Sequence, residues 1–195
     1  MKPAFRILVI SALVTVFALS QTTKSARHSP AYDSMQRKLT HVSQNGELAK
    51  PDQTPTVLTA EEINAYFAEG AIVLPTGVQR VSFQSQPGVV TARTRVDFDQ
   101  ITASRRSSNP LLMLFTGIHD VDVVARASAS GHMGAVQVES VSIDGMEVPR
   151  MALQYFVERY VTTKYPGVGL DTRFRMPSKI DVATVGANNV TLTQK

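Results

Sequence analysis

The stretch that decides the fold runs from residue 149 to residue 182 and reads PRMALQYFVERYVTTKYPGVGLDTRFRMPSKIDV. Its apolar side chains first recur at the spacing of one helix face: Leu153, Phe156, Val157, Tyr160 and Val161. Tyr165-Pro166-Gly167 is predicted to end that helix, and Met176-Pro177-Ser178 then leads into an alternating strand. A helix, an apolar-Pro-Ser/Thr step and a strand thus follow one another.

The same order of elements occurs earlier, in residues 59–83, which read TAEEINAYFAEGAIVLPTGVQRVSF. Thr59 and Glu62 have the spacing of a capping box, so a short helix begins after Thr59 and is predicted to end near Gly70. Leu74-Pro75-Thr76 repeats the apolar-Pro step before a second strand. The repeat indicates a curved sheet wrapped on helices, which is a container rather than a set of catalytic groups.

Alternating residues predict the remaining strands. One strand precedes the turn Pro87-Gly88 and another follows it, and residues 180–192 are typical of a hairpin around Asn188-Asn189. Between these hairpins, residues 121–129 alternate, and the alternation of residues 136–143 slips by one position. We expect a β-bulge near Glu139-Ser140 to cause that slip.

The inferred order is α-β-β-β-β-α-β-β, an α+β domain with a curved antiparallel sheet of about six strands wrapped on two helices. The inward face of residues 121–129 is mostly Val and Ala. Small side chains there let a helix pack closely, or leave room for a ligand, and helix packing is the favoured interpretation.

Three segments are expected. Residues 1–20 resemble a signal peptide, because Lys2 and Arg6 precede a short apolar run at residues 7–19; an uncleaved N-terminal anchor is the alternative. Residues 21–55 are predicted to be a disordered linker, and residues 56–195 a single domain. The protein is therefore expected to be periplasmic or secreted, and anchored in an inner membrane by residues 7–19 if the leader stays.

The net charge of +4 lies outside the predicted domain. Seven of the 20 basic and three of the 16 acidic residues precede residue 56, which leaves 13 of each sign in the domain. Nucleic-acid binding is disfavoured, because it would concentrate positive charge in the folded part. The basic linker suggests a weak contact with a membrane surface. With no cysteine, thiol chemistry and disulfides are excluded.

Candidate catalytic and metal sites are weak. His119 shares a strand face with Val121, whereas Asp120 and Asp122 point the other way, so the three do not converge on one ion. Asp97 and Asp99 share a face with two arginines, which favours salt pairing over a carboxylate pair.

His132 lies in a predicted loop without an acidic partner in the sequence, and residues 104–108 form a small basic loop. No metal, cofactor or catalytic residue is predicted.

Several short motifs resemble one family. They are Gly145-Met146-Glu147-Val148-Pro149 before the second helix, Phe174-Arg175-Met176-Pro177, Ile180-Asp181-Val182, the closing 186–193 segment, and the opening Leu58-Thr59-Ala60-Glu61-Glu62-Ile63-Asn64. Together they are similar to exported bacterial proteins of the DUF2993/LmeA type, within the tubular lipid-binding (TULIP-like) superfamily. The resemblance implies a highly curved antiparallel sheet around a long helix, with an apolar groove for acyl chains, and no catalytic residues.

Two hypotheses lead. The first is a non-enzymatic domain that binds lipid or another apolar ligand in the bacterial envelope. Its groove would be lined by apolar strand faces and the second helix: Val90, Ala92, Val96, Phe98, Val121, Val123, Phe156, Val157 and Tyr160. The alternative is an envelope assembly or scaffold protein whose core is filled by its own side chains. An enzyme that uses His119 or His132 is the third, weaker hypothesis.

Overall fold

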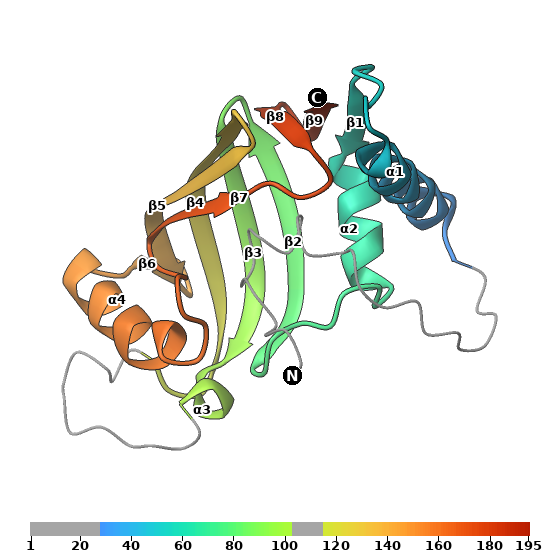
Figure 1. Ribbon diagram of the computed structural model, residues 1–195. Coiled ribbons are helices and arrows are strands. Elements are labelled where there is room, and N and C mark those ends of the chain that lie inside the picture. The colour runs from blue at the N-terminus through green and yellow to red at the C-terminus, as the bar shows by residue number, and fades with distance from the viewer. Residues whose placement is uncertain (1–27, 103–114) are drawn as a thin grey trace, which may run out of the picture.

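Both copies of the apolar-Pro step fold as turns in the computed structural model, which describes residues 28–102 and 115–195 (Figure 1). The Val78 N–H donates to the carbonyl of Pro75 at 2.9 Å, and the Ile180 N–H donates to that of Pro177, also at 2.9 Å. Each turn opens a strand, β2 (Val78–Gln86) or β8 (Ile180–Gly186). The repeat is therefore a shared local device that redirects the chain into a strand.

The predicted α+β class is confirmed, with an open antiparallel sheet of nine strands rather than about six. The other described elements are α1 (Pro30–Glu47), β1 (Thr56–Thr59), α2 (Ala60–Ala68), β3 (Val89–Asp97), α3 (Phe98–Ile101), β4 (Ile118–Ser130), β5 (Met133–Ile143), β6 (Met146–Glu147), α4 (Arg150–Phe156), the π-helical segment η3 (Val157–Thr162), β7 (Asp171–Arg175) and β9 (Asn189–Gln194). The three strands that the sequence did not predict, β1, β6 and β7, have two to five residues each. Such short strands carry too little alternation to be recognised.

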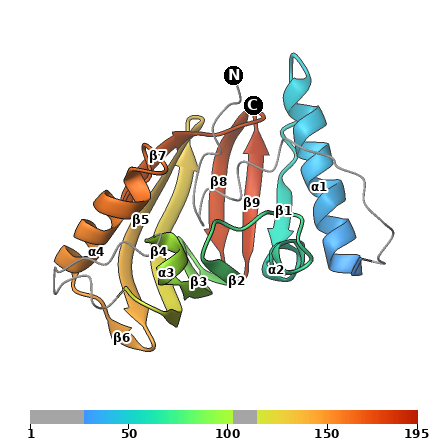
Figure 2. The same ribbon diagram turned by 90° about the horizontal axis from the view of Figure 1, so that it is seen from below.

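The strand order of the sheet is β1-β9-β8-β4-β3-β2. Strand β5 lies off this path and pairs with β4, β6 and β7. Both views place α4 at one end of the sheet and the α1–α2 pair at the other (Figures 1 and 2). The predicted bulge is confirmed: Val124 faces Ser140 and Ala125 faces Val138, which leaves Glu139 as the extra residue.

The prediction of a disordered linker over residues 21–55 is wrong for residues 30–47, which form α1. Ser29 caps this helix, because its side chain accepts from the Tyr32 N–H, and Pro30 follows at the first helical position. Only a narrow stripe of α1 is apolar and buried, namely Met35, Leu39 and Val42. The rest of its surface is polar, and for that reason its composition resembles that of a linker.

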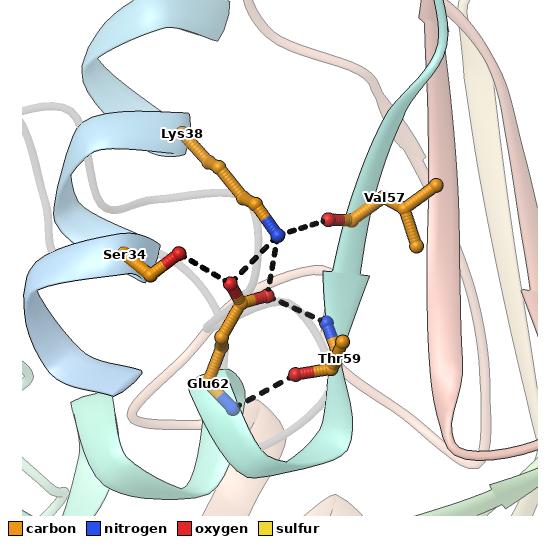
Figure 3. Close-up of polar contacts among 5 residues, drawn as sticks. All are labelled: Ser34, Lys38, Val57, Thr59 and Glu62. Atoms are coloured by element: carbon orange, nitrogen blue, oxygen red, sulfur yellow. Dashed lines mark hydrogen bonds and ion pairs between the residues drawn. The ribbon is translucent and has the colours of Figure 1, made fainter. Parts of the chain in front are cut away.

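A polar network joins α1 to α2 and β1 (Figure 3). The Lys38 ammonium lies 2.6 and 2.8 Å from the two carboxylate oxygens of Glu62 and also donates to the Val57 carbonyl at 2.7 Å. The Ser34 hydroxyl and the Thr59 N–H donate to the same carboxylate at 2.6 and 2.8 Å. The predicted capping box is confirmed, and one of its members also holds α1 in place.

A second, buried network fixes the end of α1 to the C-terminal strand. The Asn45 amide donates to the Gln194 side-chain oxygen at 2.8 Å, and the Gln194 amide donates to the carbonyls of Val42 and Ser178 at 2.7 and 2.6 Å. Both amide side chains are buried. Residues 28–55 therefore belong to the folded unit, together with the predicted domain.

Candidate functional site

An apolar cavity of about 190 Å³ lies where α4 and η3 pack against the sheet. We call it the α4 cavity. Strands β3, β4, β5 and β7 form one wall, and α3, α4 and η3 form the other. Its lining residues are Val78, Thr94, Val96, Phe98, Ile101, Phe115, Val121, Val123, Val136, Val138, Val141, Ile143, Leu153, Phe156, Val157, Val161, Val168, Gly169, Leu170, Thr172 and Phe174.

The two polar side chains of this lining are both engaged elsewhere. The Thr94 hydroxyl donates to the carbonyl of Arg80 at 2.7 Å. The Thr172 hydroxyl donates to the carbonyl of Gly169 and accepts from its N–H, each at 3.1 Å. An occupant of the α4 cavity thus meets hydrocarbon surface and no unpaired side-chain polar group among the described lining residues.

Aromatic rings make the wall of the α4 cavity beside α3. Phe156 stacks on Phe115 with their ring centroids 4.2 Å apart, and meets Phe98 edge to face at 5.6 Å. Phe98 and Phe115 also meet edge to face, at 5.5 Å. Such contacts hold rings in fixed orientations and make this wall the rigid part of the cavity.

The same helical wall contains a π-helical turn. The helix predicted for residues 149–164 is α-helical only to Phe156 and continues as η3. Val157 and Val161 of this segment line the cavity. A π turn shifts the helix face relative to the regular period, and such turns are frequent at functional sites.

A second cavity, of about 100 Å³, lies toward the other end of β4, beside the start of α2. We call it the α2 cavity. It is lined mainly by small and apolar residues from α2, β2 to β5 and β7 to β9: Ala60, Ile63, Phe83, Gln84, Ser85, Val90, Ala127, Ser128, Ala129, Ala135, Val136, Phe174, Met176, Ile180, Ala183, Val185, Asn189, Val190 and Leu192.

Seven of the nine residues predicted to line a groove border one of these cavities. Six border the α4 cavity: Val96, Phe98, Val121, Val123, Phe156 and Val157. Val90 borders the α2 cavity. Ala92 is buried but borders neither, and Tyr160 packs against Phe156 at 5.2 Å without bordering either. Phe98 reaches the cavity from α3, although it was predicted to end a strand.

The lining residues on β5 and β7 were not predicted from the sequence. The inward side chains of β5 include Val138 before the bulge and Val141 and Ile143 after it, so they do not form one simple alternation. Thr172 and Phe174 lie on the five-residue β7. Phe174 belongs to the motif Phe174-Arg175-Met176-Pro177 of the family resemblance, but its neighbours in the sequence do not indicate which way its side chain faces.

The inward face of β4 accommodates both interpretations offered for it. Val121 shares a buried cluster with Leu153 and Phe156 of α4, and Ala129 shares one with Ile63 of α2. Helices therefore pack at both ends of this face. Space remains beside each contact, because Val121 and Ala129 also border the two cavities.

His119 does not meet Asp120 or Asp122 in a metal site. Its Nδ1 lies 2.5 Å from a carboxylate oxygen of Asp144, and its Nε2 lies 2.7 Å from the carbonyl of Thr116. The Asp144 hydrogen bond raises the pKa of His119, and the same bond lowers the pKa of Asp144. Because both ring nitrogens face acceptors, an imidazolium satisfies this site and a neutral imidazole satisfies only half of it.

The predicted shared face of Asp97 and Asp99 is wrong, because β3 ends at Asp97 and Asp99 lies in α3. The Asp97 carboxylate accepts from the Gln100 N–H at 3.2 Å as the cap of α3, and Asp99 accepts from the Gly117 N–H at 3.1 Å. Cross-strand pairing exists, but with other partners. Arg93 pairs with Asp122 at 3.5 Å and Arg95 with Asp120 at 3.4 Å.

His132 occupies the β4–β5 turn with φ of 61°. Its Nδ1 lies 3.2 Å from the Ile180 carbonyl, and its Nε2 lies 3.9 Å from an Asp181 oxygen. These contacts tie the turn to β8. They explain the conformation of His132 without a substrate.

The predictions for residues 1–20 and 104–108 lie outside the described residues. Within residues 28–102 and 115–195, no three His, Asp or Glu side chains gather as a metal site, and no helix is long and apolar enough to cross a bilayer. Comparisons with family models, with curated proteins and with solved structures find no match to this chain. The resemblance to tubular lipid-binding proteins therefore stays a prediction.

Proposed function

We propose that this protein is an exported, non-enzymatic carrier or receptor that holds an acyl chain of a lipid or fatty acid in the α4 cavity. The observation that carries the proposal is the lining of that cavity, which is hydrocarbon apart from two threonines whose hydroxyls are bonded to backbone. A polar ligand would lose its hydrogen bonds to water there without replacing them, which costs free energy. A hydrocarbon chain loses none.

The walls of the cavity favour a preformed site. Three phenylalanine rings fix one side, and the sheet fixes the other. A cavity of about 150 Å³ in an apolar core stays dry and accepts a small hydrocarbon, so about 190 Å³ is enough space for part of an acyl chain. A scaffold protein with a self-filled core has no use for such a cavity, which supports the lipid hypothesis over that alternative.

The proposed location rests on Lys2, Arg6 and the apolar run at residues 7–19. We expect a periplasmic or secreted mature protein. Mass determination of the protein recovered from a secreting host tests this, because removal of the leader shortens the chain at its N-terminus and retention of the full mass contradicts cleavage.

Uptake of a fluorescent fatty acid by the purified protein tests the proposed binding, together with native mass spectrometry of what copurifies. The decisive variant is Val123→Phe, whose ring would enter the α4 cavity. Val124→Phe is the matched control, because Val124 is the next residue of β4, borders neither cavity and points to the other face. We expect a loss of affinity of at least about tenfold for Val123→Phe and an unchanged affinity for Val124→Phe.

Circular dichroism checks that both variants fold. The check is needed because overpacking lowers the free energy of unfolding by about 1–3 kcal/mol where no cavity accommodates the added atoms. Equal loss of uptake in the two variants, or none in either, places binding outside the α4 cavity. A wild-type protein that is purified free of lipid and takes up no fatty acid overturns the proposal and favours the scaffold alternative.

A further inference from the structure

We propose that Phe174 divides one continuous apolar trough into two chambers and thereby sets the length of acyl chain that the protein accepts. This inference rests on the proposed function of the α4 cavity and deepens it. It commits to a single unbranched acyl chain of medium length as the occupant. Longer chains are excluded because they would have to pass the Phe174 ring.

The two cavities follow one another along the inward face of β4. Val121 and Val123 border the α4 cavity, and Ala127 and Ala129 border the α2 cavity. Eight residue steps separate the first from the last of these, which corresponds to about 27 Å of extended strand. One leaflet of a bilayer core is about 15 Å thick. The length of the whole inward face exceeds this thickness, and the length of each half is a little less than it.

Of the described residues, Val136 and Phe174 are the two that border both cavities. Val136 on β5 pairs with Ala127 on β4, and Phe174 on β7 pairs with Gly134 on β5. The backbones of Val136 and Phe174 therefore lie at the level of Ala127 and Ala129, in the Ala half of β4, and their side chains border the α4 cavity as well as the α2 cavity. Val136 is fixed in the centre of the sheet, whereas Phe174 reaches the trough by its ring.

Gly134 explains how the ring reaches that far. A Cβ atom at Gly134 would lie 2.5 Å from Phe174 Cζ and 2.6 Å from its Cε2, closer than any real contact. The ring thus lies directly on the bare backbone of β5, extended from β7 toward β4. Gly134 in turn pairs with Ala129, so the neighbouring floor of the trough carries only a methyl group.

Small side chains on the far side of the ring leave the α2 cavity available to a longer occupant. The floor and walls there include Ala127, Ala129, Ala135 and Ala183. Phe174 is half-buried and belongs to the margin of its cluster, not to its fully buried centre. Removing its ring would join the two chambers, while the strands that frame them stay in register.

Binding of octanoic acid and palmitic acid to the full-length protein tests the proposal, by displacement of a fluorescent fatty acid. Phe174→Ala removes the partition and Phe174→Leu shortens it. Phe83→Ala is the matched control, because it removes the same atoms from the α2 cavity alone. We expect the wild type to prefer octanoic acid, and the ratio of palmitic to octanoic affinity to rise at least about tenfold in Phe174→Ala, less in Phe174→Leu, and not in Phe83→Ala.

The outcomes separate this inference from the proposed function. A wild type that binds both acids equally, or a ratio that Phe83→Ala shifts as much as Phe174→Ala does, overturns the partition and leaves acyl-chain binding intact. A wild type that binds neither acid overturns the proposed function, and the inference with it. If Phe174→Ala does not fold, the smaller change in Phe174→Leu decides: a rise of the ratio supports the partition, and an unchanged ratio overturns it.

Discussion

Replacement of Glu62 by alanine tests whether α1 is an integral part of the fold. The side chain of Glu62 is 9% exposed, and its carboxylate accepts from Lys38, Ser34 and the backbone of Thr59. Burial raises the pKa of Glu62, but these hydrogen bonds outweigh burial and leave the pKa below its ordinary value of 4.5. The hydrogen bonds from Lys38, Ser34 and Thr59 therefore favour the charged form of the Glu62 carboxylate.

The expected cost follows from those partners. Losing one partner of a fully buried ion pair costs about 3–5 kcal/mol, and losing an exposed one costs about 0–1 kcal/mol. The Lys38 side chain is 33% exposed and can turn to water, so the pair lies between these limits. Adding the lost hydrogen bonds of Ser34 and Thr59, we expect Glu62→Ala to lower the free energy of unfolding by about 3 kcal/mol.

Urea unfolding followed by circular dichroism measures this loss, and a melting temperature lower by about 6–12 °C should accompany it. Glu61→Ala is the matched control. It removes the neighbouring carboxylate from the same helix turn, but Glu61 is exposed, so we expect a loss of at most about 0.5 kcal/mol. Amide hydrogen exchange should also accelerate in α1 of the Glu62→Ala protein, because α1 loses its anchor.

The pH dependence has a fixed sign. A carboxyl whose pKa is lowered on folding stabilises the folded state above its unfolded pKa and loses that contribution as the pH falls through its folded pKa. The difference between wild type and Glu62→Ala should therefore be full near neutral pH and shrink below 4.5. Equal stability of the Glu62→Ala and Glu61→Ala proteins near neutral pH would refute the reasoning, since the network would then contribute nothing to the docking of α1.

Two further predictions concern other polar contacts. Replacing His119 by glutamine should destabilise the protein more at about pH 5.5 than at about pH 9, as measured by urea unfolding. The raised pKa of His119 stabilises the folded state below pH 6.5, and this contribution disappears as the pH rises through the folded pKa. An equal loss at both pH values would contradict this reasoning. Replacing Gln194 by alanine should lower the free energy of unfolding by about 2–3 kcal/mol in the same assay, because buried groups of Asn45, Val42 and Ser178 lose their partner. Replacing Gln84 by alanine should cost far less, because Gln84 is exposed and its side chain makes no hydrogen bond to a described residue. A similar loss in the two variants would show that the Gln194 contacts are not specific.

The sequence predicted those features that adjacent residues determine. The capping box of Thr59 and Glu62, the two apolar-Pro turns, the Pro87-Gly88 turn and the bulge at Glu139 all depend on contacts within a few residues or on the period of one strand. The same periodicity placed seven of the nine proposed lining residues beside a cavity. Local patterns carry this information because a side chain's face follows from backbone geometry.

Only the tertiary structure decided which distant segments meet. α1 looked like a linker because its buried stripe is narrow and its anchors, Glu62 and Gln194, lie far along the chain. Asp144 rather than Asp120 pairs with His119, and β5 and β7 supply lining that no period indicated.

Phe174 is the clearest case. The sequence placed it only in a short motif of the family resemblance and predicted no strand there. In the structure it lies against Gly134 and borders both cavities. A sequence fixes the faces of its elements, whereas a cavity is the space that several packed elements leave between them, and it exists only after they have met.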